Sequence, residues 1–326
     1  MEVAIAIVLI VLGVAGFYGF IRLQKSVQRG LQNHGRVAET PTFDDIEVAE
    51  GPLGPDEIVY LYAHEFARPR LAGTPTLPRD RVSAPMAGTE VDAEDLTSRL
   101  LYATICELYR EKYLEIRLVE RDPTYLPPFP QKKWELQLRR AQRFPPGPLC
   151  DTLSVGFDLT RRRLQAKQQR IEEDKLWVGL DELIERGLKA VRQELSFWER
   201  SGVHGDLRNY VSSSLVARGY LVAPQGDTWF DKVRTRKLLS NKAAIETVAD
   251  QARSLKHRLE TFCKMHGSSE AQVDAPNAKL HDNVAPDLAE GGHPLEELPI
   301  DDCLRLSIYE ALLSIKQLEP SGEPGV

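Results

Sequence analysis

The longest run of apolar positions in the chain lies at its N-terminus. Residues Val3 to Ile21 carry no charged side chain and are rich in Ile, Val and Leu. As a helix, these nineteen residues would match the ~30 Å hydrocarbon core of a bilayer at ~1.5 Å per residue. A cleaved signal peptide is the alternative, but no basic residue precedes the run and no small-residue cleavage site follows it. We therefore expect a membrane-spanning anchor.

The charges that flank this run predict its orientation. Arg22, Lys25, Arg29 and Arg36 follow the run, whereas Glu2 is the only charged side chain before it. The basic flank of a membrane span usually stays in the cytoplasm. We therefore expect a single-pass membrane protein whose C-terminal domain is cytoplasmic.

Beyond the anchor, the spacing of apolar residues predicts a mainly α-helical domain. Apolar side chains recur at intervals of three and four residues, which places them on one face of a helix. The helices predicted in this way cover residues 56–67, 92–112, 159–200, 206–218 and 241–266.

Between the helices, a period of two predicts short β-hairpins. Apolar and charged positions alternate over residues 114–119 and again over 134–139, with a proline-rich loop between them. A second, smaller hairpin is predicted from the extended stretches 220–222 and 228–230, next to Gly219, which suits a left-handed helix cap. The predicted fold class is mainly α with short β-hairpins, preceded by one transmembrane helix.

The order helix, strand, loop, strand occurs twice. With an offset of 107 residues, the two helix-to-strand junctions pair Leu108 with Leu215, Tyr113 with Tyr220 and Leu114 with Leu221. This order resembles the winged-helix superfamily over residues 56–266, at the level of pattern and without the motif of a specific family. The resemblance implies two units in which a hairpin closes on the last helix of its own unit. An irregular α+β domain with similar junctions is the alternative.

The same patterns divide the chain into segments. Prolines and glycines mark the linkers, and the polar, acidic composition before the last helix predicts disorder. The segments are the transmembrane anchor 1–21, a linker 22–55, a first winged-helix-like unit 56–148, a second helical, winged-helix-like unit 149–266, a disordered acidic linker 267–299, an amphipathic helix 300–318 and a tail 319–326. The last helix is apolar over most of its circumference, so it either docks on the domain or binds a partner.

Charge is unevenly distributed along the chain. The net charge is −6, and residues 267–326 hold twelve acidic and three basic side chains, so the rest of the chain carries +3. Basic residues concentrate over 131–170 and 232–258. Such runs bind the phosphates of nucleic acids or of anionic lipids, or they only keep helix faces soluble. The candidate anion- or partner-binding residues are Lys132, Lys133, Arg139, Arg140, Arg161, Arg162, Arg163, Arg234, Arg236 and Lys237.

No motif in the sequence points to catalysis or to a cofactor. Four cysteines lie far apart without a CxxC pair, which predicts free, buried thiols. His64 and Glu65 resemble the start of a metalloprotease helix, but Arg68 stands where the second histidine belongs. The histidines and the cysteine late in the helix 241–266 lack further metal ligands. We therefore expect no catalytic, cofactor-binding or metal-binding residues.

These observations favour a membrane-anchored cytoplasmic module that binds or scaffolds other molecules without enzymatic activity. Its expected partners are the bilayer and another protein, with the oligomeric state left open. A membrane-tethered winged-helix regulator that binds DNA and a binder of anionic lipid headgroups are the alternatives. An enzyme whose site is scattered along the sequence is a third.

Overall fold

A computed structural model describes residues 48–49, 51–70, 81–121, 133–166, 175–194, 202–222, 238–267 and 299–318. All helices and strands named below belong to one compact unit, Glu47–Val326. The expected membrane span Val3–Ile21 and most of the acidic segment 267–299 lie outside the described residues. Within the described ranges, no helix is both long and apolar enough to cross a membrane.

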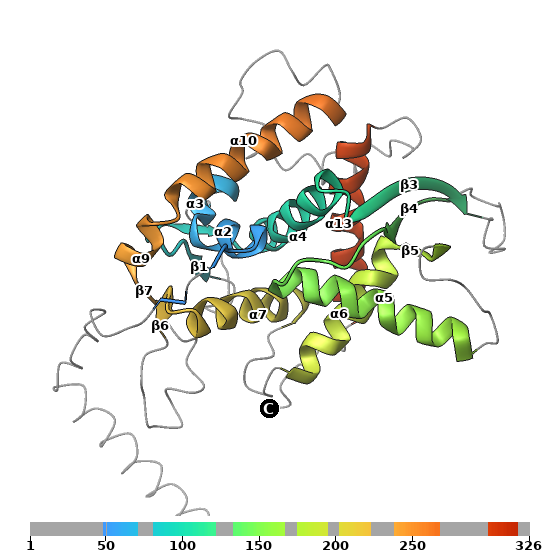
Figure 1. The fold of residues 1–326 in the computed structure, drawn as a ribbon, viewed down its shortest axis with the longest axis horizontal. Coiled ribbons are helices and arrows are strands. Elements are labelled where there is room, and N and C mark those ends of the chain that lie inside the picture. Colours follow the sequence, from blue (N-terminus) through green and yellow to red (C-terminus); the bar gives the residue numbers. More distant parts are fainter. Residues whose placement is uncertain are drawn as a thin grey trace, which may run out of the picture. The chain divides into compact units, whose positions relative to one another are not determined.

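The described part is mainly helical with short antiparallel sheets, in agreement with the helices and hairpins of the predicted fold class (Figure 1). The helices are α2 (Pro55–Leu61), α3 (Ala63–Phe66), α4 (Ala93–Arg110), α5 (Pro148–Ala166), α6 (Leu180–Glu194), α7 (Val203–Ala217), α9 (Lys242–Glu246), α10 (Ala249–His266) and α13 (Ile300–Leu318). The strands are β1 (Arg81–Ser83), β2 (Glu90–Asp92), β3 (Leu114–Arg121), β4 (Lys133–Arg140), β5 (Trp177–Gly179), β6 (Leu221–Val222) and β7 (Leu239–Ser240).

The first predicted helix-to-strand junction is confirmed. Helix α4 ends where Lys112 adopts a left-handed backbone conformation, with φ of +61°. The Tyr113 N–H donates to the Leu108 carbonyl (2.9 Å) and the Lys112 N–H donates to the Tyr109 carbonyl (3.0 Å), which is the Schellman pattern of helix termination. At the far end of the following hairpin, the Ala141 N–H returns to the Tyr113 carbonyl at 2.9 Å.

The second junction repeats this hydrogen-bond pattern. Helix α7 ends at Gly219, with φ of +79°, as the glycine there predicted. The Tyr220 N–H donates to the Leu215 carbonyl (3.0 Å) and the Gly219 N–H donates to the Val216 carbonyl (3.1 Å). The Asn241 N–H then returns to the Tyr220 carbonyl at 3.1 Å. The residues paired at the two junctions by sequence therefore hold equivalent backbone positions.

The hairpin of β3 and β4 is extended by a third strand that the sequence pattern did not predict. β3 and β4 pair antiparallel from Leu114↔Arg140 to Arg121↔Lys133, and β5 adds to the other edge of β4. The single helix predicted over 159–200 is wrong, because α5 ends at Ala166 and β5 precedes α6.

Three smaller departures from the prediction concern short elements. The segment between the helices predicted over 56–67 and 92–112 contains the antiparallel pair of β1 and β2. The partner of β6 is β7, whereas the stretch 228–230 predicted for this role lies outside the described residues. The helices predicted over 56–67 and 241–266 are each broken once, near Tyr62 and near Thr247.

One hydrophobic core joins the two units expected from the sequence. Helix α2 packs against both α4 and α7, and α5 crosses α6 at close range. A Cβ on Gly156 of α5 would lie 2.6 Å from the Leu183 carbonyl oxygen of α6, so glycine is required for this approach. Leu53, in the predicted linker, is also buried in this core.

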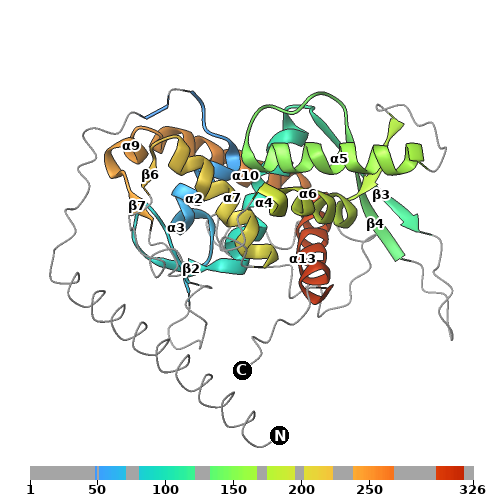
Figure 2. The same ribbon diagram turned by 90° about the horizontal axis from the view of Figure 1, so that it is seen from below.

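The C-terminal helix α13 docks on the domain, against α6, α4 and α7 (Figures 1 and 2). A buried polar cluster fixes it to α4. The Tyr102 hydroxyl donates to Asp301 Oδ1 (2.5 Å), and Arg305 donates to Asp301 Oδ2 (2.9 Å) and to the Tyr102 hydroxyl (3.2 Å). Since polar groups buried without partners are costly, this cluster favours one register of α13 on α4.

Candidate functional site

The three-stranded sheet has one apolar face and one polar face. The apolar face, which includes Leu114, Leu136 and Leu138, packs on the core. Side chains on a strand alternate between the two faces, so the strand pairing places the polar side chains together on the opposite face. We call this set the sheet face; its members are Glu115, Arg117, Glu135, Gln137, Arg139 and Trp177.

Two arginines lie over the indole ring of Trp177 on the sheet face. The guanidinium carbon of Arg117 is 4.0 Å from the ring centroid, and that of Arg139 is 5.1 Å away. Arg117 also donates to Gln137 Oε1 (2.8 Å), and Arg139 donates to Glu115 Oε2 (3.0 Å). Cation–π contacts and ion pairs therefore hold these side chains in a fixed arrangement on a rigid sheet.

Trp177 is the residue of this site that the sequence did not reveal. The candidate list contains Arg139 but not Trp177, because Trp177 fell inside the helix predicted over 159–200. The available signal was weak, since β5 is only three residues long. Its partner strand β4 was predicted, but the pairing depends on tertiary structure.

Three further described candidate arginines of the first basic run form ion pairs within the domain. Arg140 lies on the opposite face of β4 from the sheet face and contacts Asp158 at 3.0 Å. Arg161 contacts the same carboxylate at 3.7 Å, and Arg163 contacts Glu182 at 3.2 Å. Much of the positive charge predicted from this run is therefore balanced by α5 and α6 themselves.

The remaining candidates are only partly covered by the structure. Arg162 is exposed on α5, and no ion pair of Arg162 is found within the described part of the chain. Lys133 begins β4, opposite Arg121. The candidates Lys132, Arg234, Arg236 and Lys237 lie outside the described residues.

A groove-reading helix would need the arginines of α7 and its C-cap, but both contact neighbouring segments of the domain. Arg208 is buried and donates to the Ala93 carbonyl at 2.6 Å. Arg218 forms an ion pair with Glu57 (2.8 Å) and also donates to the Gly51 carbonyl (2.8 Å). Both arginines link α7 to neighbouring segments, so phosphate binding by them would disrupt the fold.

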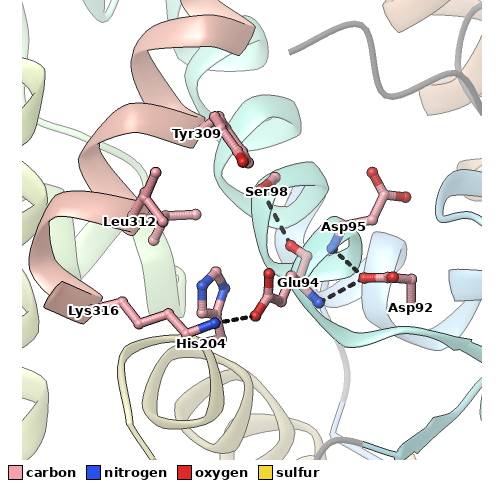
Figure 3. A pocket seen from close by; sticks show the side chains of 9 residues that line it. Asp92, Glu94, Asp95, Ser98, His204, Tyr309, Leu312 and Lys316 are labelled. Carbon is pink, nitrogen blue, oxygen red and sulfur yellow. Dashed lines mark hydrogen bonds and ion pairs between the residues drawn. The ribbon is translucent and has the colours of Figure 1, made fainter. Parts of the chain in front are cut away.

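A small pocket of about 170 Å³ lies where α4 and α7 begin and α13 ends (Figure 3). Lys316 of α13 donates to Glu94 of α4 at 2.5 Å, and His204 of α7 lies beside this pair. Asp92 is engaged as the N-cap of α4, where it accepts from the Glu94 and Asp95 N–H groups. The pocket is lined by Asp92, Glu94, Asp95, Ser98, His204, Tyr309, Leu312, Leu313 and Lys316.

The electrostatics of this pocket favour a neutral histidine. Burial, with smaller contributions from the charges of Arg208 and Lys316, lowers the pKa of His204 to about 4, against the opposing effect of Glu94. At neutral pH the imidazole therefore carries no charge, and the Glu94–Lys316 ion pair closes one side of the pocket. We assign no ligand to this pocket because its carboxylates already have partners in the protein.

The cysteines and histidines form no metal centre among the residues that the structure describes. All four cysteines are buried and free, as predicted. His266 packs against the rings of Phe262 and Tyr109, and Cys263 is buried beside them on α10. The described site of greatest chemical interest is therefore the sheet face.

Comparisons with protein-family models, with curated proteins and with solved structures found no match to this chain.

Proposed function

We propose that this chain is a non-enzymatic binding or scaffolding module, held at the membrane by its N-terminal segment and facing the cytoplasm. The observation that carries the proposal is the sheet face, where Arg117 and Arg139 lie over Trp177 on a three-stranded sheet. Tryptophan and arginine are the residues most enriched among the energetic centres of protein interfaces. Because the side chains of Trp177 and the two arginines are already ordered here, they would lose little conformational entropy when a partner binds.

The repeated helix-to-strand junctions support an interpretation as two winged-helix-like units. In such units, DNA is usually read by the helix that precedes the hairpin. Here the corresponding helices, α4 and α7, are packed into the core over most of their circumference. This favours a protein partner over DNA, because neither helix offers an open face for a major groove.

The charge pattern also favours a protein partner over phosphate groups. Binding of DNA or anionic lipid requires basic side chains that release bound counterions. Arg139, Arg140, Arg161 and Arg163 instead contact carboxylates of the domain. For Arg162, no such contact is found in the ranges that the structure covers.

The proposal is tested by capturing the full-length protein from detergent-solubilised membranes in parallel with two variants. Trp177→Ser removes the centre of the sheet face. Tyr309→Ser is the matched control, because Tyr309 is also a half-buried aromatic residue but lies on α13. We expect a protein that is recovered with the wild type and with Tyr309→Ser but is reduced at least about tenfold with Trp177→Ser.

The same preparations decide between the alternatives. Titration with duplex DNA and with vesicles of anionic or neutral lipid, at rising salt, measures the two phosphate-binding alternatives directly. Tight, salt-sensitive binding to DNA or anionic vesicles, together with no partner sensitive to Trp177→Ser, would contradict the proposal.

A further inference from the structure

Among the residues that the structure describes, no strand pairs with the outer edge of β3. β3 is an outermost strand of its sheet, with β4 between it and β5 (Figure 1). β3 is eight residues long, whereas β5, at the opposite edge, has three. Within the described ranges, β4 is the only strand paired with β3. Long unprotected edges of this kind are the usual templates for strand addition.

The register of the hairpin shows which residues of β3 present their backbone to this edge. The Tyr113 carbonyl accepts from the Ala141 N–H and therefore points toward β4. Backbone groups alternate along an antiparallel strand, so the odd-numbered residues of β3 point toward β4. The N–H and C=O groups of Leu114, Ile116 and Leu118 then point outward.

We propose that β3 pairs antiparallel with β3 of a second copy of this chain, with Ile116 opposite Ile116. In this register Leu114 lies opposite the partner's Leu118, and Glu115 lies opposite the partner's Arg117. The outward-pointing residues of the two copies exchange backbone hydrogen bonds, and both sheets join into one. The inference goes beyond the proposed binding of another protein and does not depend on it.

Charge complementarity selects this partner and this register. Centring the pairing one residue earlier would place Glu115 opposite Glu115, and one residue later would place Arg117 opposite Arg117. Centring it on Leu118 would place Ile116 opposite the charged Glu120. Like charges directly opposite each other destabilise a strand pair, and opposite charges stabilise it.

On the polar face, Glu115 can keep its bond from Arg139 in this pairing, whereas Arg117 must turn from the Trp177 ring toward the partner copy. The hydrogen bonds from Arg139 to Glu115 end on its Oε2 atom. Its Oε1 atom can therefore receive a guanidinium N–H from the partner copy. The pair Glu115 with the partner's Arg117 occupies a position without direct backbone bonds, where facing side chains approach most closely.

The experiment is cysteine cross-linking of the full-length protein in detergent. Ile116→Cys places two thiols in directly opposed positions, about 5.5 Å apart between Cα atoms, which is within the range of a disulfide. Leu118→Cys is the matched control on the same face and edge, because its two copies are separated by four residues along the strand, or roughly 14 Å. The four native cysteines are buried and should contribute little background.

We expect a disulfide-linked dimer from Ile116→Cys under mild oxidation with diamide, and little from Leu118→Cys or the wild type. A second measurement uses sedimentation of Ile116→Pro, which removes an outward N–H but no bond of the β3–β4 ladder. Each dimer loses two hydrogen bonds, so its dissociation constant should rise about 30-fold. Equal cross-linking of both cysteine variants, no cross-linking of either, or an unchanged dissociation constant for Ile116→Pro would overturn the proposal.

Discussion

Asp56 is a carboxyl group enclosed by the protein, and its ionisation should make the domain less stable as the pH rises. The residue is fully buried at the start of α2. Its Oδ2 atom accepts the Leu149 N–H at 2.8 Å and so caps the first turn of α5. Its Oδ1 atom has no hydrogen-bond partner within the part of the chain that the structure describes.

Burial raises the pKa of Asp56 from 3.8 to about 7, with a smaller contribution from the charge of Glu57, while the hydrogen bond from Leu149 opposes the increase. Between these two pH values the folded state binds more protons than the unfolded state. Stability from this group is therefore greatest below about pH 4 and falls as the pH rises to about 7. At 1.36 kcal/mol per pKa unit, the loss amounts to roughly 4 kcal/mol.

The substitution Asp56→Asn tests this reasoning because it keeps the shape and the acceptor for the Leu149 N–H but removes the charge. We expect the free energy of unfolding of the wild type to fall by a few kcal/mol more than that of the variant between pH 5 and pH 8. Urea unfolding followed by tryptophan fluorescence measures both curves. Asp151→Asn is the control, since it removes an exposed carboxyl group from the first turn of α5, the turn that Asp56 caps. Parallel pH curves for the wild type and Asp56→Asn would refute the account.

Three further predictions follow from the packing and from the sequence. Leu312→Asp should lower the thermal midpoint by several degrees, because it buries a charge at a cost of roughly 3 kcal/mol or more. Leu313→Asp, on the exposed side of α13, should change the midpoint little. Equal effects of the two variants in differential scanning fluorimetry would contradict the docking of α13. Tyr102→Phe should lower the free energy of unfolding in urea by about 1–3 kcal/mol, because it leaves Asp301 Oδ1 without its donor, and no change would show that the buried cluster contributes nothing to stability. A reporter fused after Val326 should be active in the cytoplasm, and its signal should weaken when the basic residues after the apolar run are changed to Glu; activity outside the cytoplasm would show the opposite orientation. The residues changed in this last variant are Arg22, Lys25 and Arg29.

The sequence pattern predicted most of the long, strongly periodic elements and missed several short ones. Helix α4 and the pair β3–β4 carry their periods over many residues, so local pattern suffices. Strand β5 has three residues between two helices, which are too few to establish a period of two. The sequence pattern therefore predicted one continuous helix across it. The left-handed cap was visible at Gly219 but not at Lys112, because a lysine gives no local sign of a positive φ.

The candidate site was harder to predict from the sequence because it forms through contacts between segments that are distant in the sequence. The basic runs are genuine features of the chain, but their charges are balanced by carboxylates on other elements. Arg140 of β4 contacts Asp158 of α5, and Arg163 of α5 contacts Glu182 of α6. Neither pairing follows a helical or strand period. The stacking of Arg117 on Trp177 likewise arises only when β5 joins the sheet.

The central claim, that the sheet face binds another protein, is tested most directly by photo-cross-linking in native membranes. A benzophenone side chain replaces Trp177 in the full-length protein, and a control variant carries it at Arg253, which is exposed on α10. Position 177 lies on the strand farthest from the β3 edge, so an adduct there is distinct from pairing between copies. The account predicts a cross-link from position 177 to a different protein and none from position 253. Adducts from position 177 that contain only lipid or nucleic acid, or the same protein adducts from both positions, would contradict it.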